Sequence, residues 1–171
     1  IYKDIQMVFQ DAIGSFNPRF TIEESIMEYV CNLCSKTEAD KKHKVDNLLR
    51  MVGLSKEYKY RYPHELSGGQ CQRAAIARAL SAHPKILVCD EATSALDVSV
   101  QAQIVELLKE MQEKMNISYL FITHDLALVS SFCDRVAVMK NGKIVEVGDA
   151  KEVINNPKDE YTKLLIKSAY F

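Results

Sequence analysis

A chain of 171 residues has the length of one ordinary domain and is long enough to bury a hydrophobic core. Hydrophobic residues make up 47% of it and charged residues 26%, and the formal net charge of -1 argues against a protein that binds nucleic acid through a basic surface. No apolar run approaches the roughly 20 residues that a membrane-spanning helix needs and no signal peptide is recognisable, so we expect any membrane connection to run through partner subunits.

The first part of the chain is predicted to form a strand that leads into a loop. Apolar side chains alternate loosely over residues 1–9, which favours a strand, and Gln10 follows it. Residues 11–18 contain Gly14 and the pair Asn17-Pro18, and this turn chemistry predicts a loop. Considered alone, Gln10 is an ordinary loop amide.

Two amphipathic helices are predicted next. Thr21 and Glu24 have the spacing of a capping box, which predicts a helix from there to about residue 35. A second helix is predicted over about residues 39–52, and Gly53 ends it. The apolar side chains expected to be buried are Ile22, Ile26, Tyr29, Val30 and Leu33 in the first helix and Val45, Leu48, Leu49 and Val52 in the second.

The five cysteines indicate reduced thiols. Their number is odd and they are scattered through predicted helices and strands, which does not suit a disulfide framework. Cys31 and Cys34 form a CxxC pair, but no second pair or histidine cluster accompanies them. We therefore favour free thiols over a zinc site at these two residues.

A serine and two glycines stand directly before a strongly helical stretch. Residues 70–80 are rich in alanine, so Ser67, Gly68 and Gly69 are predicted to form the turn at a helix N-terminus. Unpaired backbone N–H groups and the helix dipole make such an end an anion site, and glycines let a phosphate approach the backbone. The alternative is that Ser67 only caps the helix and the glycines only turn the chain.

Two adjacent carboxylates follow the next predicted strand. Residues 85–89, Lys-Ile-Leu-Val-Cys, are apolar from Ile86 onward, which predicts a parallel strand covered on both faces. Asp90 and Glu91 then stand at its carboxyl end, where open α/β sheets bind their ligands. There Asp90 can hold a hydrated Mg²⁺ while Glu91 polarises an attacking water. A solvated strand end is the alternative for these carboxylates considered alone.

A long helix and another strand are predicted after Asp97. The helix presents an apolar stripe of Ile104, Leu107, Leu108, Met111 and Met115. Residues 119–122 are predicted to form a second buried strand, and His124 follows its end. If the strands are parallel, His124 lies at the same sheet edge as Asp90.

The last part of the chain is predicted to hold a hairpin and two short helices. Residues 136–139 (Val-Ala-Val-Met) and 144–147 (Ile-Val-Glu-Val) flank Asn141-Gly142, a strong signal for a β-hairpin. Beyond Gly148, the two helices are separated by residues 155–157, Asn-Asn-Pro.

Five motifs occur in order along this sequence: MVFQD, LSGGQ followed by QRAAIARAL, ILVCDE, ATSALD and FITHD. Together they resemble the nucleotide-binding domain of an ATP-binding cassette (ABC) transporter. The resemblance implies an α/β fold of the P-loop NTPase kind, with a mostly parallel sheet core and an inserted helical subdomain. It places the helical subdomain, with LSGGQ, at about residues 20–75, and the core at residues 1–19 and 76–171, including the C-terminal hairpin and helices.

The resemblance also implies ATP and Mg²⁺ as ligands and assigns roles within one subunit. Glu91 becomes the general base, Asp90 a Mg²⁺ ligand, and Gln10 a contact of both the Mg²⁺ and the attacking water. His124 would donate a hydrogen bond to the γ-phosphate. Asp97 would link the two sites of a dimer.

Each site is implied to be shared between two subunits that face head to tail. Ser67, Gly68 and Gly69, with Gln70 in the same motif, would grip the γ-phosphate of ATP bound to the opposite subunit. The expected partners are therefore a second ABC ATPase, identical or related, and transmembrane permease subunits, with no nucleic acid.

Three longer stretches narrow the resemblance. DAIGSFNPRFTIEESI, SALDVSVQAQIVELLKEMQ and NNPKDEYTKLLI are most similar to ATPases of the oligopeptide, dipeptide and nickel importer group. This implies an ATPase, peripheral at the cytoplasmic face of the membrane, that hydrolyses ATP to drive uptake of peptides or nickel. Nothing physical in these residues selects the cargo.

The phosphate-binding loop of this family, G-x-x-x-x-G-K-[ST], is not present in the sequence. The Gly142-Lys143 pair is followed by Ile144, and Ala137 stands where the first glycine belongs. We therefore expect these residues to be the C-terminal part of a longer domain, without the N-terminal strands and the phosphate-binding loop. Alone, they are expected to be inactive, to bind ATP weakly or not at all, and to self-associate.

Two other functions are consistent with some of the motifs. An ABC-type ATPase of DNA repair or chromosome maintenance would carry a zinc module or a long coiled coil, for which residues 10–66 have no room. A non-catalytic partner would supply only the LSGGQ motif to another subunit. Glu91 and His124 match the catalytic pattern, which argues against the second alternative.

Overall fold

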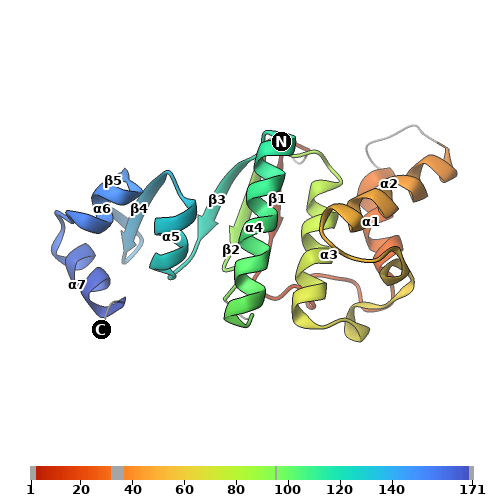
Figure 1. The fold of residues 1–171 in the computed structure, drawn as a ribbon, viewed down its shortest axis with the longest axis horizontal. Helices are drawn as coiled ribbons and strands as arrows, with labels where there is room; N and C mark the ends of the chain where they lie inside the picture. The colour runs from red at the N-terminus through yellow and green to blue at the C-terminus, as the bar shows by residue number, and fades with distance from the viewer. Residues whose placement is uncertain (1–2, 32–36, 95, 170–171) are drawn as a thin grey trace. The chain divides into compact units, whose positions relative to one another are not determined.

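The computed structural model describes residues 3–31, 37–94 and 96–169 (Figure 1). Contacts divide the chain into two compact units, Ile1–Ile122 and Thr123–Phe171. This division keeps residues 20–75 in one unit with the strands that precede and follow them. The finer boundary of a helical subdomain remains a prediction.

The first unit contains nine elements in chain order within its described residues. They are β1 (Ile5–Val8), α1 (Ile22–Cys31), α2 (Glu38–Met51), the short 3-10 helices η1 (Lys56–Tyr60) and η2 (Pro63–Glu65), α3 (Gly68–Leu80), β2 (Ile86–Asp90), α4 (Val98–Met115) and β3 (Ser118–Ile122). The second unit contains α5 (Leu126–Phe132), β4 (Arg135–Lys140), β5 (Lys143–Asp149), α6 (Ala150–Asn155) and α7 (Glu160–Ala169).

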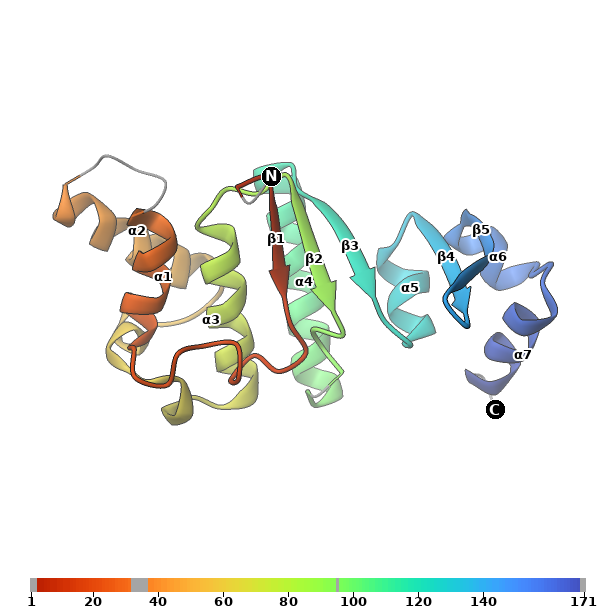
Figure 2. The same ribbon diagram turned by 180° about the vertical axis from the view of Figure 1, so that it is seen from behind.

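The sheet of the first unit has three strands in the order β1-β2-β3, and both pairings are parallel. Its register sets Val8 beside Cys89 and Asp90 beside Ile122. All three strands therefore end at the same edge of the sheet (Figure 2). The predicted α/β class with a parallel sheet is confirmed, and the residues that follow the three strands share one edge.

One face of this sheet is packed against α4. Figure 1 draws α4 in front of the strands and Figure 2 draws it behind them. The Tyr119 hydroxyl donates a hydrogen bond of 2.9 Å to the Leu108 carbonyl, which joins β3 to α4. The fully buried side chains on this side include Leu87 and Cys89 of β2. The predicted stripe on α4 is confirmed at Ile104, Leu107, Leu108 and Met111, which are buried, whereas its last member, Met115, is half-buried.

The opposite face differs from the sequence prediction. We expected both apolar strands to be covered, but the exposed fractions are 38% for Ile86, 55% for Leu120 and 48% for Ile122. The register places these three side chains on one face, away from α4. The prediction of two-sided burial is therefore wrong for this face in the described structure. An apolar run predicts that a strand is buried, but it does not identify the element that packs against it.

Two helices between β1 and β2 follow their sequence signals: α1 begins at its predicted capping box, and α2 ends before Gly53. The Thr21 N–H donates to Glu24 Oε2 at 2.7 Å and the Glu24 N–H to Thr21 Oγ1 at 3.3 Å, which completes the predicted capping box. Gly53 follows the C-cap residue Val52 of α2 and has a φ of 72°, a conformation that favours glycine. The predicted core of α2, formed by Val45, Leu48, Leu49 and Val52, is buried. Leu33, Cys34 and the expected helix end near residue 35 lie outside the described residues, and so does the side chain of Cys31.

The second unit is built on the predicted hairpin. Strands β4 and β5 are antiparallel, and the turn residues Asn141 and Gly142 have φ values of 50° and 75°, as a type I′ turn requires. Glu146 of β5 accepts hydrogen bonds from the backbone N–H groups of Lys158 and Asp159 at 2.9 and 3.0 Å. These bonds lower the pKa of the Glu146 carboxyl and join the hairpin to the loop before α7.

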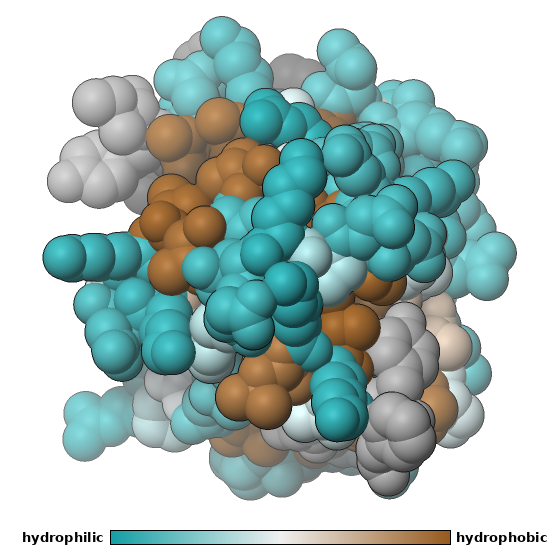
Figure 3. All heavy atoms as spheres, turned by 90° about the vertical axis from the view of Figure 1, so that its left-hand side faces the viewer, coloured by the Kyte–Doolittle hydropathy of each residue, from teal (hydrophilic) through white to brown (hydrophobic). Residues whose placement is uncertain are grey.

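Hydrophobic side chains also reach the surface of the second unit. Met139 and Ile144 are partners across the hairpin, and each is 59% exposed. Figure 3 views the side that is on the left in Figure 1 and shows several hydrophobic areas separated by hydrophilic side chains.

Among the described residues, no helix has both the length and the apolar character needed to cross a membrane.

Candidate functional site

The two predicted carboxylates lie at the edge of the sheet where the strands end. Asp90 is the last residue of β2, and Glu91 follows it in a sharp turn. The Glu91 N–H donates to the Ile122 carbonyl of β3 at 2.9 Å, and the Ser94 N–H donates to the Glu91 carbonyl at 3.1 Å. Glu91 has a φ of 45°, in the left-handed region that non-glycine residues rarely adopt. Tertiary contacts therefore hold the backbone of Glu91 in an uncommon conformation, as often occurs at functional sites.

Gln10 lies close to the same turn. Its Nε2 donates a hydrogen bond of 3.2 Å to Ser94 Oγ, and Ser94 Oγ donates in turn to the Glu91 carbonyl at 3.0 Å. Three of the predicted site residues, Gln10, Asp90 and Glu91, are thus brought together within the first unit. Ser94 was missed by the sequence analysis; its only signal was its place in the ATSALD motif.

The oxygen atoms at this edge are of the kind that Mg²⁺ prefers. Mg²⁺ takes hard oxygen ligands and is commonly held by one or two carboxylates together with substrate phosphates and water. No hydrogen bond to the Asp90 carboxylate or to Gln10 Oε1 occurs among the described residues. In the same residues, no group of three or more His, Cys, Asp and Glu side chains is arranged to hold a metal alone. Asp90 and Gln10 therefore fit a metal that arrives with a phosphate ligand.

The LSGGQ turn forms the N-terminus of α3, as predicted. Ser67 Oγ accepts the Gln70 N–H at 3.3 Å, and Gln70 Oε1 accepts the Ser67 N–H at 3.0 Å, so the two residues form a capping box. The Gln70 Nε2 donates to the Tyr58 hydroxyl at 2.9 Å. Ser67 therefore caps α3, and the phosphate-binding role of the turn remains a prediction. Ser67 and Gly68 are also exposed, so the helix end is accessible to an anion.

Gly69 has a second role that the sequence did not reveal. A Cβ atom at this position would lie 2.7 Å from Val100 Cγ1, whereas one at Gly68 would lie 3.6 Å from Leu96 Cδ2. The first distance is a steric clash and the second an ordinary contact. Gly69 is therefore required for the close approach of α3 to the start of α4, independently of any phosphate.

We expect Gly69→Ala to destabilise the natural polypeptide that carries this sequence by about 1–2 kcal/mol, because the added methyl group overpacks the contact with Val100. Gly68→Ala is the matched control and should stay within about 0.5 kcal/mol. Urea denaturation measures both. In a Val100→Ala background the cost of Gly69→Ala should vanish; an unchanged cost there would show that the clash is not its cause.

The other two predicted site residues are placed differently. Asp97 is exposed and directly precedes α4, and its side chain makes no capping hydrogen bond. His124 belongs to the second unit, two residues beyond the end of β3. The neighbouring Asp125 caps α5 by accepting the N–H groups of Ala127 and Leu128 at 2.9 and 3.1 Å. The roles of Asp97 and His124 remain predictions.

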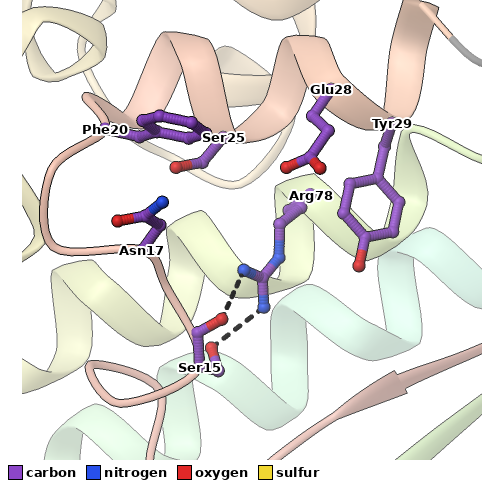
Figure 4. Close-up of a pocket in the computed structure, with 7 residues that line it drawn as sticks. All are labelled: Ser15, Asn17, Phe20, Ser25, Glu28, Tyr29 and Arg78. Atoms are coloured by element: carbon purple, nitrogen blue, oxygen red, sulfur yellow. Dashed lines mark hydrogen bonds between the residues drawn. The ribbon is translucent and has the colours of Figure 1, made fainter.

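A cavity of about 610 Å³ lies beside the loop that follows Gln10 (Figure 4). It is lined by Ser15, Asn17, Phe20, Ser25, Glu28, Tyr29 and Arg78. Arg78 of α3 donates to the Ser15 carbonyl at 2.8 Å and to Ser15 Oγ at 2.9 Å, and its guanidinium lies 4.2 Å from the centre of the Phe16 ring. Burial lowers the pKa of Arg78. Arg78, one of the two arginines of the alanine-rich α3, was not among the residues singled out from the sequence.

The hydroxyl of Ser25 is a further polar group in this cavity. Ser25 is 4% exposed, and its Oγ has no hydrogen-bond partner among the residues that the structure describes. Figure 4 shows Ser25 facing the space between α1 and the loop, with Glu28 and Tyr29 farther along α1. Buried hydroxyl groups are normally satisfied, so this cavity suits a polar ligand or segment.

Comparison with known proteins agrees with these features. Residues 1–94 match the ABC transporter family. The chain is 51% identical over 170 residues to the oligopeptide transport ATP-binding protein OppF of Haemophilus influenzae and 47% identical over 167 residues to OppF of Bacillus subtilis. It is 50% identical over 168 residues to the glutathione import ATP-binding protein GsiA of Pectobacterium atrosepticum. Each match covers 97% of this chain.

The chain spans only part of these relatives: 50% and 55% of the two OppF proteins and 27% of GsiA. Solved structures are similar as well. CbiO1 of Clostridium perfringens, part of the ABC transporter complex CbiONQ, superposes with a TM-score of 0.80 at 34% identity, over 90% of this chain and 60% of its own. The ATP-binding cassette MJ0796, a dimer bound to ADP and phosphate, has a TM-score of 0.76 at 29% identity, over 86% of this chain and 64% of its own. Because the family match alone covers more than half of its residues, the chain belongs to the ABC transporter family.

Proposed function

We propose that the natural polypeptide containing this chain hydrolyses ATP to drive the import of peptides through transmembrane permease subunits. The observation that carries the proposal is the convergence of Gln10, Asp90 and Glu91 at the carboxyl edge of the parallel sheet. The names of OppF and GsiA, which state oligopeptide transport and glutathione import, support peptides over nickel as the cargo.

The residues of the sheet edge divide the chemistry among them. Asp90 and the amide oxygen of Gln10 would hold Mg²⁺, which would neutralise charge on the phosphates of ATP. Glu91 would accept a proton from the water that attacks the γ-phosphate. His124 would donate a hydrogen bond to the same phosphate. A carboxylate general base and a separate metal ligand are both needed, because one carboxylate cannot bind the metal and accept the proton at once.

A second subunit completes the site. The sequence has no G-x-x-x-x-G-K-[ST] loop. Its residues would therefore supply the Mg²⁺ ligands, the general base that acts on water and the LSGGQ motif, but not the phosphate-binding loop. Ser67, Gly68 and Gly69 would bind the γ-phosphate of ATP held by the partner ATPase, with Gln70 shaping the turn and Asp97 linking the two sites. The dimeric state of MJ0796 with ADP and phosphate supports this arrangement.

The permease is proposed to contact the loop that follows Gln10. The cavity next to this loop is polar, has the carboxylate of Glu28 at its rim and holds the hydroxyl of Ser25, which has no partner within the described part of the chain. If a segment of the permease binds there, its movement would be transmitted to Gln10 through the intervening residues 11–17. This contact would hold the ATPase at the cytoplasmic face of the membrane.

The test is ATP turnover by the natural polypeptide that carries this sequence, measured with Mg²⁺ and after removal of Mg²⁺ by EDTA. We expect turnover that depends on Mg²⁺, and loss of labelled oligopeptide uptake in the natural host when the gene is deleted. ATP binding without any turnover, alone or with its permease, would contradict the proposal and favour a non-catalytic partner. Stimulation by DNA would favour a repair ATPase instead.

A further inference from the structure

The hydroxyl of Ser94 connects two groups of the proposed site that are far apart in the sequence. It accepts the hydrogen bond from Gln10 Nε2 at 3.2 Å and donates one to the Glu91 carbonyl at 3.0 Å. Gln10 and Ser94 are separated by 84 positions. Both side chains are exposed, so neither is immobilised by tight packing. These two hydrogen bonds are therefore what holds the Gln10 amide in place.

The direction of these bonds follows from the number of hydrogen atoms available. A serine hydroxyl has one hydrogen and two lone pairs. Because Ser94 gives its hydrogen to the Glu91 carbonyl, it can only accept from Gln10. Of the two ends of a glutamine amide, only the NH₂ group donates. The NH₂ end of Gln10 must therefore face Ser94, which turns its Oε1 away.

The turn at Glu91 keeps this arrangement in one geometry. Glu91 is in the left-handed region at a φ of 45°, and its N–H is bonded to Ile122, so its carbonyl points toward Ser94. The carbonyl accepts both the N–H and the hydroxyl of Ser94, at 3.1 and 3.0 Å. A rotation of the Ser94 hydroxyl toward Gln10 would break the second of these bonds.

We infer that Ser94 is a positioning residue that orients the Gln10 amide so that its oxygen, and not its NH₂ group, is presented to Mg²⁺. Mg²⁺ binds the oxygen of an amide and not its NH₂ group. A flipped Gln10 amide would present N–H hydrogens to the cation and would repel it. Ser94 acts through Gln10 and does not itself touch the metal. The inference rests on the proposed function, because it explains how Gln10, one ligand of the proposed Mg²⁺ site, is oriented before the nucleotide binds.

The experiment compares Ser94→Ala, Ser94→Thr and the control Ser99→Ala, an exposed serine near the start of α4, in the natural polypeptide. The first readout needs no nucleotide: NMR of the Gln10 side-chain amide protons, assigned with Gln10→Ala. In the unchanged protein one of these protons should exchange slowly with water and resonate downfield. Ser94→Ala should remove this signature, and Ser94→Thr and Ser99→Ala should keep it.

The second readout is the Mg²⁺ concentration that half-saturates ATP turnover. Loss of one orienting hydrogen bond should raise it by roughly threefold to tenfold in Ser94→Ala, with Ser94→Thr within about twofold of the unchanged protein. Gln10→Ala and the double variant Gln10→Ala/Ser94→Ala should need the same Mg²⁺ concentration, because Ser94 acts only through Gln10.

The outcomes separate this inference from the proposed function. An unchanged Gln10 amide signal in Ser94→Ala overturns the inference, and so does an unchanged Mg²⁺ requirement in a polypeptide that hydrolyses ATP. If the unchanged polypeptide shows no turnover, the proposed function fails, and the amide signal alone then decides whether Ser94 orients Gln10.

Discussion

Glu91→Gln should lower ATP turnover by the natural polypeptide at least a hundredfold while leaving ATP binding and dimerisation intact. A positioned general base contributes roughly 10²–10⁴ to the rate, and a glutamine amide cannot accept the proton of the attacking water. The substitution keeps the size of the side chain, and the N–H and carbonyl of residue 91 still bond to Ile122 and Ser94. The turn that places the residue at the sheet edge should therefore persist.

Steady-state turnover and nucleotide binding, each measured in the presence of Mg²⁺, test this expectation. Glu113→Gln, at an exposed position of α4, is the matched control and should have normal turnover. Turnover within a few-fold of the unchanged protein in Glu91→Gln would remove Glu91 from the role of general base. Loss of ATP binding as well would indicate that the residue acts on the nucleotide itself.

Arg78→Ala should destabilise the protein by about 2–4 kcal/mol. Its guanidinium donates two hydrogen bonds to Ser15, and hydrogen bonds to charged groups typically contribute about 1.5–3 kcal/mol each, less the cost of burying the charge. Removing it leaves the Ser15 carbonyl without this donor and removes the stacking on Phe16. The loop after Gln10 would then lose its main attachment to α3.

Chemical denaturation measures the change in the free energy of unfolding. Arg78→Lys keeps the charge but not the planar pair of donors, so its destabilisation should be intermediate. Arg50→Ala removes an exposed cation from α2 and should stay within about 0.5 kcal/mol. An Arg78→Ala protein as stable as the Arg50→Ala control would show that the contacts with Ser15 contribute nothing to stability.

The sequence by itself determined those features that depend on neighbouring residues. Thr21 with Glu24, and Ser67 with Gln70, form their capping boxes within one helical turn. Asn141-Gly142 forms its turn because both residues tolerate a positive φ. Asp90 and Glu91 follow their strand directly along the chain, so a correct strand prediction also places them at the edge of the sheet. In each case the interacting groups are a few residues apart, and their geometry is set by the local backbone.

The tertiary structure alone decided the contacts between distant segments. Ser94 reaches Gln10 only because β1 and β2 pair in parallel and end together, and Arg78 reaches Ser15 across 63 positions. The clash that reserves position 69 for glycine comes from Val100, on a different helix. The open face of the sheet was likewise not foreseen, since an apolar strand has the same pattern whether or not a helix covers it. Such contacts depend on how elements pack, and a local sequence pattern does not identify the segment against which it packs.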